Sequence, residues 1–150
     1  MNGTQKMPNK KKLDETYMNV AYQIAGLSKC KRRIVGAIIV KDNNILSFGY
    51  NGTPAGMDNC CENEIDNKLY TKWLVLHAET NAITKVARST MSSAGSTLYT
   101  TTSPCAQCAK LIIQAGIKRV VFHEEYHSST KAFKLLKDAD IKVKQLKYDW

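Results

Sequence analysis

The chain has 150 residues, which is enough for one domain and leaves little room for a second. Hydrophobic residues make up 43% of it, so a disordered composition is excluded and an ordinary globular core is expected. The polar, basic stretch 1–12 does not resemble a signal peptide, and no apolar run is long enough to span a bilayer. We therefore expect a cytoplasmic protein without a membrane partner.

The net charge of +9 raises the question of a nucleic-acid partner, because basic proteins often bind polynucleotides. Apart from a short run at Lys10–Lys12, the basic residues are dispersed, and aromatic residues do not alternate with them in a stacking pattern. This distribution disfavours an extended nucleic-acid surface. A small phosphorylated ligand or a solvated basic surface fits the charge equally well.

The first element that the sequence predicts is a helix. Residues 1–12 are expected to form a flexible basic arm ahead of a single domain over residues 13–150. From Leu13 onward, apolar residues recur at helical spacing, and Gly26 marks the expected end of the helix.

A β-hairpin is predicted next, because two apolar runs flank the turn sequence Asp42-Asn43-Asn44. Residues 51–70 are rich in glycine, proline and asparagine and are expected to form a long loop. The predicted elements are strands Ile34–Lys41 and Ile45–Tyr50, helix Trp73–Arg88, strand Ser96–Thr101, helix Ala106–Ala115, strand Lys118–His123, helix Thr130–Lys137 and strand Ile141–Leu146. This alternation predicts an α/β fold with crossover connections and a sheet covered on both faces.

Two short motifs carry metal-binding residue types at predicted helix starts. They are His77-Ala78-Glu79 and Pro104-Cys105-Ala106-Gln107-Cys108. Together they match the H-x-E…P-C-x-x-C signature of zinc-dependent deaminases. A catalytic Zn²⁺ takes three protein ligands and keeps one position for water, so His77, Cys105 and Cys108 are the predicted ligands.

Glu79 lies two residues after His77, close enough to reach a bound water without being a ligand. Zn²⁺ lowers the pKa of that water and makes it a nucleophile. Glu79 is therefore the predicted proton shuttle: it takes the proton of the water and delivers it to a ring nitrogen and then to the leaving ammonia.

The cysteines allow other interpretations. Five are present: Cys30, Cys60, Cys61, Cys105 and Cys108. An odd number in a chain without a secretory signal argues against a disulfide framework. A structural site of four cysteines, or a redox pair at the C-x-x-C motif, would leave His77 and Glu79 unexplained. A zinc-binding module without catalysis would have no need of Glu79, so an enzyme is predicted.

With these residues in hand, the chain resembles the deoxycytidylate (dCMP) deaminase family of the cytidine deaminase superfamily. Beyond the zinc motifs, the resemblance is carried by segments Cys30–Val40, Gly49–Gly56, His77–Ile83 and Ala115–Val121. It implies a three-layer α/β/α cytidine-deaminase-like fold with a five-stranded mixed sheet. It further implies hydrolysis of dCMP to dUMP and ammonia by a homo-oligomer, usually a hexamer, with dCTP and Mg²⁺ as activator and dTTP as inhibitor.

The resemblance also implies roles for residues around the zinc motifs. Substrate contacts are implied for Asn51, Ala78, Ser103, Ser28, Arg33 and Tyr126. Effector contacts are implied for Gly49, Tyr50, Asn51, Gly52, Gly56, Lys29 and Arg32. Guanidinium groups suit a phosphate dianion, although only one or two of these basic side chains are expected to touch ligand. Tyr126 is expected to close over the base, with partial core packing as its alternative role.

Two departures from the family pattern bear on substrate and metal. His127 stands where relatives often carry arginine, and histidine titrates near neutrality, so deamination of dCTP, alone or alongside dCMP, stays open. Deamination of cytosine or adenine within a polynucleotide is the other alternative. Some relatives bind a second zinc, but Asn67 and Val75 occupy two of its positions here. Free, buried cysteines are therefore expected at Cys30 and at Cys60 or Cys61.

Overall fold

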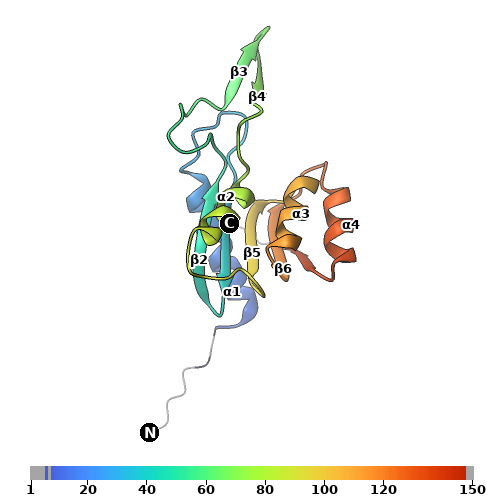
Figure 1. The fold of residues 1–150 in the computed structure, drawn as a ribbon. Coiled ribbons are helices and arrows are strands. Elements are labelled where there is room, and N and C mark those ends of the chain that lie inside the picture. Colours follow the sequence, from blue (N-terminus) through green and yellow to red (C-terminus); the bar gives the residue numbers. More distant parts are fainter. Residues whose placement is uncertain (1–5, 7, 148–150) are drawn as a thin grey trace.

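One mixed sheet forms the centre of the computed structural model, which describes residues 6 and 8–147. Its strands lie in the order β2-β1-β5-β6-β7 (Figure 1). They are β1 (Gly36–Lys41), β2 (Asn44–Tyr50), β5 (Thr97–Thr102), β6 (Arg119–Glu124) and β7 (Lys142–Gln145). Strand β1 pairs antiparallel with both β2 and β5, whereas β5, β6 and β7 run parallel to one another. The predicted five-stranded mixed sheet is confirmed.

Helices cover both faces of this sheet. They are α1 (Lys10–Ala25), α2 (Ala78–Ala87), α3 (Ala106–Gln114) and α4 (Thr130–Asp138). Ile38 and Tyr99 belong to the buried cluster that includes α1, whereas Ile39 and Leu98 belong to the cluster that includes α2, α3 and α4. Because successive strand residues point to opposite faces, α1 forms one outer layer and the other three helices form the second. The expected three-layer α/β/α fold is confirmed.

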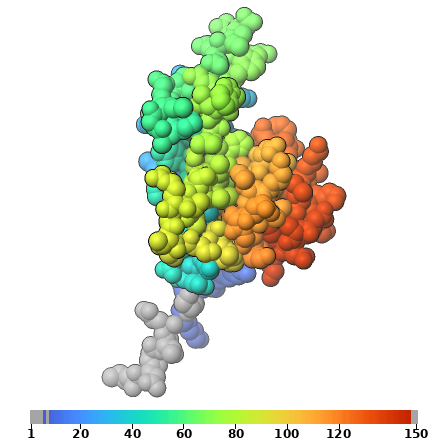
Figure 2. Space-filling model, viewed as in Figure 1, coloured from blue at the N-terminus to red at the C-terminus, as the bar shows by residue number. Residues whose placement is uncertain are grey.

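The segment 51–70 is not one long loop, as the sequence had suggested. Within it begins a second antiparallel hairpin of β3 (Glu62–Ile65) and β4 (Lys68–Thr71), which projects away from the main sheet (Figures 1 and 2). Its turn residues, Asp66 and Asn67, have positive φ angles of 50° and 61°. The strands escape prediction because nearly all of their residues are exposed and show no apolar alternation.

Helix α1 begins at Lys10, three residues before the predicted start at Leu13. Asn9 caps it, because its Oδ1 accepts a hydrogen bond from the backbone N–H of Lys12 at 2.8 Å. Lys10–Lys12 therefore belongs to the helix and not to an arm, and residues 1–5 and 7 of the predicted arm lie outside the described residues. In the described part of the chain, no helix is long and apolar enough to cross a membrane.

Helix α2 begins at Ala78, later than the predicted start at Trp73. The preceding Leu76 forms a β-bridge with Gly52, in which each backbone N–H donates to the carbonyl oxygen of the other residue at 2.8–3.1 Å. This pairing holds the segment before His77 extended, so that His77 becomes the N-cap of the helix.

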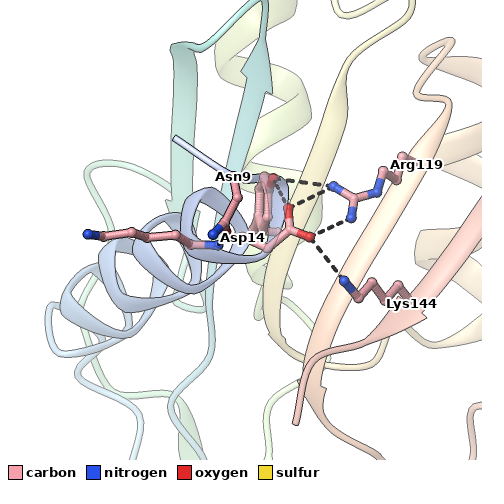
Figure 3. Close-up of polar contacts among 6 residues, drawn as sticks. Asn9, Asp14, Arg119 and Lys144 are labelled. Carbon is pink, nitrogen blue, oxygen red and sulfur yellow. Dashed lines mark hydrogen bonds and ion pairs between the residues drawn. The ribbon is translucent and has the colours of Figure 1, made fainter. Parts of the chain in front are cut away.

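A buried carboxylate ties α1 to three strands (Figure 3). Asp14 of α1, 1% exposed, accepts hydrogen bonds from Arg119 of β6 at 2.6 and 2.8 Å. Its Oδ1 also accepts one from the Tyr99 hydroxyl of β5 at 2.7 Å, and its Oδ2 pairs with Lys144 of β7 at 3.4 Å. Burial alone would raise the pKa of Asp14, but these donors outweigh it and hold the pKa below its usual value.

Candidate active site

Two helix starts meet at the site. His77 and Cys105 occupy the N-cap positions of α2 and α3, which serine, asparagine or aspartate usually fill. Both residues have an extended backbone and neither makes a capping hydrogen bond with its side chain. The imidazole and the thiol are therefore available to a shared centre, and Cys108 joins them from the first turn of α3.

The three predicted zinc ligands lie together. The Nδ1 atom of His77 is 3.5 Å from the Sγ of Cys105 and 3.3 Å from the Sγ of Cys108. All three ligand atoms lie within 4.8 Å of one another. A tetrahedral ion with zinc–nitrogen and zinc–sulfur bonds of about 2.0 and 2.3 Å places neighbouring ligands about 3.5 Å apart. The donor set and its spacing fit one Zn²⁺ with a fourth position open.

Hydrogen bonding within the cluster separates the pKa values of the two thiols. Hydrogen bonds with Cys108 and His77 lower the pKa of Cys105 to about 3. The bond with Cys105, together with burial, raises the pKa of Cys108. The bond with Cys105 also raises the pKa of His77. A lowered pKa makes the Cys105 thiol a readier source of thiolate, which is the form of cysteine that ligates zinc.

Glu79 lies in the first turn of α2 and is 4% exposed. Its Oε1 accepts a hydrogen bond from the Thr100 hydroxyl at 3.1 Å, and its Oε2 accepts one from the Sγ of Cys108 at 3.6 Å. Burial raises the pKa of the Glu79 carboxyl above its usual value. A carboxyl that holds a proton more readily suits a group that must take up a proton and release it again.

Thr100 of β5 is a site residue that the sequence interpretation missed. Its hydroxyl has two acceptors, Glu79 at 3.1 Å and the carbonyl oxygen of Thr102 at 2.8 Å. When the single hydroxyl proton points to Thr102, the Oγ1 atom can accept a hydrogen bond from a protonated Glu79. The Thr100 hydroxyl can therefore form a hydrogen bond with Glu79 whether the Glu79 carboxyl is ionised or protonated. A threonine in a buried strand carries no signal that would reveal this role.

A cavity of about 290 Å³ opens beside the cluster. Besides His77, Glu79 and Cys105, its lining includes the predicted substrate residues Asn51, Ala78, Ser103, Arg33 and Tyr126. Arg32, predicted for the effector, lines this cavity too, as do Thr71 and Val75, for which the sequence predicted no ligand contact. Ser28 is not part of the lining; its hydroxyl donates to the backbone carbonyl of Asn51 at 2.8 Å.

Arg33 and Tyr126 form a pair at the cavity wall. The guanidinium carbon of Arg33 lies 4.7 Å from the centroid of the Tyr126 ring, which is a cation–π contact. The backbone N–H of Tyr126 donates to the Oγ of Ser103 at 2.7 Å. His127 is exposed, and its ring centroid lies 4.5 Å from that of Tyr126. The pair offers an aromatic face and a cation to one ligand.

Both polar atoms of the Asn51 side chain form hydrogen bonds with backbone groups. Its Oδ1 accepts from the N–H of Val35, and its Nδ2 donates to the carbonyl oxygen of Arg33, both at 2.8 Å. Asn51 also lines a second cavity of about 210 Å³. The predicted effector residues Lys29, Tyr50, Gly52 and Gly56 line this second cavity as well.

Gly49, also predicted for the effector, does not line the second cavity. It packs under α2 instead, where an added Cβ would lie 2.3 Å from the carbonyl oxygen of Ala78. The absence of a side chain at Gly49 therefore allows β2 to pack closely against α2.

Cys30 and Cys61 form a disulfide, so the expectation of free cysteines is wrong for this pair. The pairing depends on the β3–β4 hairpin, which brings residues 31 positions apart to a Cα separation of 5.2 Å. Cys60 is free and exposed. Glu62 has a carboxylate oxygen within 4.8 Å of the two sulfurs, but sulfurs bonded to each other do not act as thiolate ligands.

Known proteins share this sequence pattern. Residues 11–124 match the family model of the cytidine and deoxycytidylate deaminase zinc-binding region. The chain is 36% identical over 141 residues to the deoxycytidylate deaminase of Saccharomyces cerevisiae, and 42% identical over 128 residues to that of Homo sapiens. These matches cover 90% and 79% of this chain but 45% and 68% of the relatives, so the chain spans less than half the length of the yeast protein.

The fold matches as well. The structure of dCMP deaminase from the cyanophage S-TIM5 in complex with dCMP and dUMP superposes with a TM-score of 0.84 at 43% identity. The match covers 92% of this chain and 100% of that one. A three-layer fold with a His-Cys-Cys cluster and a buried glutamate defines the class of zinc-dependent deaminases. Within that class, the chain belongs to the cytidine and deoxycytidylate deaminase family.

Proposed function

We propose that the protein hydrolyses dCMP to dUMP and ammonia. The observation that carries this proposal is that one cavity joins the His77-Cys105-Cys108 cluster, the buried carboxyl of Glu79 and the cation of Arg33. Deamination needs the cluster and the carboxyl, and a monophosphate needs a cation. The similarity to a cyanophage enzyme solved with dCMP and dUMP supports the same substrate class.

His77, Cys105 and Cys108 would hold Zn²⁺, which when bound lowers the pKa of a water toward neutrality. The carboxylate of Glu79 takes one proton from the attacking water and passes it to N3 of the pyrimidine as the water oxygen adds to C4. It then takes the second proton of that oxygen and delivers it to the amino group on C4, so that the C4–N bond breaks, ammonia leaves and the C4 carbonyl of dUMP forms. Thr100 keeps the carboxyl of Glu79 oriented in both states, because its hydroxyl can either donate or accept.

The remaining cavity residues bind and orient the nucleotide. Backbone groups at Ala78 and Ser103 hold the pyrimidine edge, and the ring of Tyr126 covers the base. Arg33, fixed by its contact with Tyr126, pairs with the phosphate. Arg32 lines the same cavity and adds a second positive charge.

The second cavity is our proposed regulatory site, for dCTP with Mg²⁺ as activator and dTTP as inhibitor. Lys29 provides a positive charge there. Asn51 lines both cavities and bonds the backbone of Arg33, so a ligand in the second cavity has a short physical path to the substrate site.

A homo-oligomer, in hexameric form, is also proposed. Apolar side chains on and beside the β3–β4 hairpin are exposed: Met57, Ile65, Leu69, Tyr70 and Trp73, of which Trp73 is 94% exposed. Exposed apolar patches of this kind commonly mark protein interfaces.

Ammonia release by the zinc-loaded protein tests the substrate, with dCMP, dCTP and deoxycytidine, each with and without dTTP. Preference for dCMP and suppression by dTTP are expected. Equal turnover of dCTP would support the alternative substrate, and His127→Arg would then test whether the exposed histidine beside Tyr126 permits it. No ammonia release from any of the three compounds would contradict the proposal. A cytosine-containing oligonucleotide would then test the polynucleotide alternative.

Glu79→Gln tests the proton shuttle. Turnover of dCMP should fall by about 10³-fold or more, because the amide cannot carry the proton. The zinc content should stay at that of the wild type, since Glu79 is not a ligand. Steady-state rates and metal analysis on the same preparation check both statements, and activity that survives the change would refute this mechanism.

A further inference from the structure

The loop between α1 and β1 concentrates positive charge beside the catalytic cavity. Lys29, Lys31, Arg32 and Arg33 stand within five residues of one another, outside any regular element. Arg32 and Arg33 both line the cavity. Like charges at this density repel one another, so the loop needs external contacts to hold two guanidinium groups toward one ligand.

The first of these contacts comes from Glu62, the first residue of β3. Its side chain is buried although it belongs to an otherwise exposed hairpin, and the residue is 7% exposed. One carboxylate oxygen, Oε1, accepts hydrogen bonds from the backbone N–H groups of Lys31 at 2.7 Å and Arg32 at 3.1 Å. Two consecutive N–H groups of the loop therefore share one acceptor oxygen.

Two more contacts tie the same hairpin to the same loop. The disulfide between Cys30 and Cys61 links the loop covalently to the residue before Glu62. The Nη1 of Arg32 donates to the Oγ1 of Thr71 in β4 at 3.0 Å. The hairpin therefore holds the loop at three consecutive positions, directly before Arg33.

We infer that Glu62 is a positioning residue for the substrate phosphate, acting through the backbone of Lys31 and Arg32 to hold the Arg32 and Arg33 side chains at the catalytic cavity. This inference rests on the proposed function, because it takes the cavity ligand to be a nucleoside monophosphate. Glu62 does not line the cavity, so its effect on the phosphate passes through the loop.

An electrostatic role and a positioning role of Glu62 predict opposite changes in KM for dCMP when its carboxylate is removed. Glu62 brings a negative charge close to the phosphate site, so its removal would tighten phosphate binding if charge alone mattered. If the carboxylate fixes the loop, its removal weakens phosphate binding instead. The direction of the change in KM for dCMP therefore separates the two effects.

The experiment compares Glu62→Ala, Glu62→Gln and Glu64→Gln in the zinc-loaded protein. Glu62→Ala removes the acceptor, whereas Glu62→Gln removes the charge but keeps an oxygen that accepts both N–H groups. Glu64→Gln is the matched control, since Glu64 is exposed on the same strand. KM and kcat are measured for dCMP, and kcat/KM for deoxycytidine, which has no phosphate.

Glu62→Ala should raise KM for dCMP about tenfold and leave kcat within about twofold, because uniform binding of the phosphate is lost. Its kcat/KM for deoxycytidine should be unchanged, and Glu62→Gln and Glu64→Gln should both behave like the wild type. Thr71→Val, an exposed change that removes the partner of Arg32, should raise KM for dCMP in the same direction and serves if Glu62→Ala does not fold.

An unchanged or lowered KM for dCMP in Glu62→Ala, or equal losses on dCMP and deoxycytidine, would overturn the inference. A Glu62→Gln protein as impaired as Glu62→Ala would also overturn it, because the acceptor would then be irrelevant. These results leave the proposed function standing as long as the wild type deaminates dCMP. A wild type inactive on dCMP would overturn the proposed function and this inference together.

Discussion

At the scale of single residues, the candidate site lies where two helices lack a side-chain hydrogen bond at their N-caps. An N-cap side chain that satisfies a backbone N–H typically stabilises a protein by about 1 kcal/mol. His77 and Cys105 hold N-cap positions without making such a bond. Both side chains remain available to a metal. We expect metal binding to raise the free energy of unfolding and so to offset the loss of the two capping hydrogen bonds.

Thr100 carries a prediction about orientation. Thr100→Val keeps the shape of the side chain but removes the partner of Glu79, so kcat for dCMP should fall about tenfold with KM unchanged. Thr100→Ser retains the hydroxyl and should keep most of the activity. Steady-state kinetics of both variants decide the matter, and a Thr100→Ser protein as slow as Thr100→Val would assign the effect to packing.

Residue-level prediction from sequence is possible where the chemistry lies in a short motif. Local spacing predicts His77, Cys105 and Cys108 as ligands, and the structure brings their side-chain atoms within 4.8 Å of one another. Thr100 and the Cys30–Cys61 disulfide depend on contacts between distant segments. Neither leaves a local pattern, so tertiary structure was needed to find them.

At the scale of elements, the position of α2 depends on Gly49 of β2, which has no side chain where the strand meets the helix. A Cβ added to Gly49 of β2 would lie 2.3 Å from the carbonyl oxygen of Ala78 and 2.5 Å from the backbone nitrogen of Ala82. Both are backbone atoms of α2, so no rotamer change relieves the overlap. The helix that carries Glu79 can approach the sheet this closely only over a glycine.

Gly49→Ala should therefore displace α2 and weaken both stability and zinc retention. We expect a loss of about 1–3 kcal/mol in the free energy of unfolding, typical of overpacking. Gly52→Ala is the matched control for stability, because an added Cβ there meets nothing within 4 Å. Urea titrations with metal analysis provide the test, and equal stabilities for the two variants would contradict it.

The elements themselves were largely predictable. The five strands of the main sheet and the four helices follow from hydrophobic periodicity, apart from shifts at the ends, of which the start of α2 is the largest. The β3–β4 hairpin was missed, although its Asp66-Asn67 turn repeats the Asp42-Asn43 pair of the first hairpin. Its strands are exposed, and exposure removes the alternation on which strand prediction depends.

At the scale of the whole molecule, Asp14 connects an outer layer to the sheet (Figure 3). Its pKa is held below the usual value, so its ionised form stabilises the fold. That contribution is fully present above the unfolded pKa of about 3.9 and is lost as the pH falls through the lower pKa of the folded state. Acid should therefore loosen the contact between α1 and strands β5, β6 and β7.

Asp14→Asn should lower the free energy of unfolding at pH 7 by about 3 kcal/mol, because it leaves Arg119 without its charged partner. Asp138→Asn breaks the exposed pair with Lys134 and should leave the free energy of unfolding close to that of the wild type, because solvent screens this pair. Urea titrations of both variants at pH 7 and pH 3 provide the test. The difference between Asp14→Asn and the wild type should shrink at pH 3, and a constant difference would count against the titration of Asp14.

The antiparallel seam between β1 and β5 has a consequence for a nascent chain. Strand β1 emerges from the ribosome early, and one of its edges has no partner until Thr102 has followed, with Cys105 and Cys108 close behind. The predicted ligands come together only when α2 and α3 have packed on the sheet, so we expect metal capture to follow the pairing of β1 with β5 and not to nucleate the sheet. A chelator added during refolding should leave the rate of sheet formation unchanged and lower only the stability of the product, whereas slower sheet formation would show that the metal acts earlier.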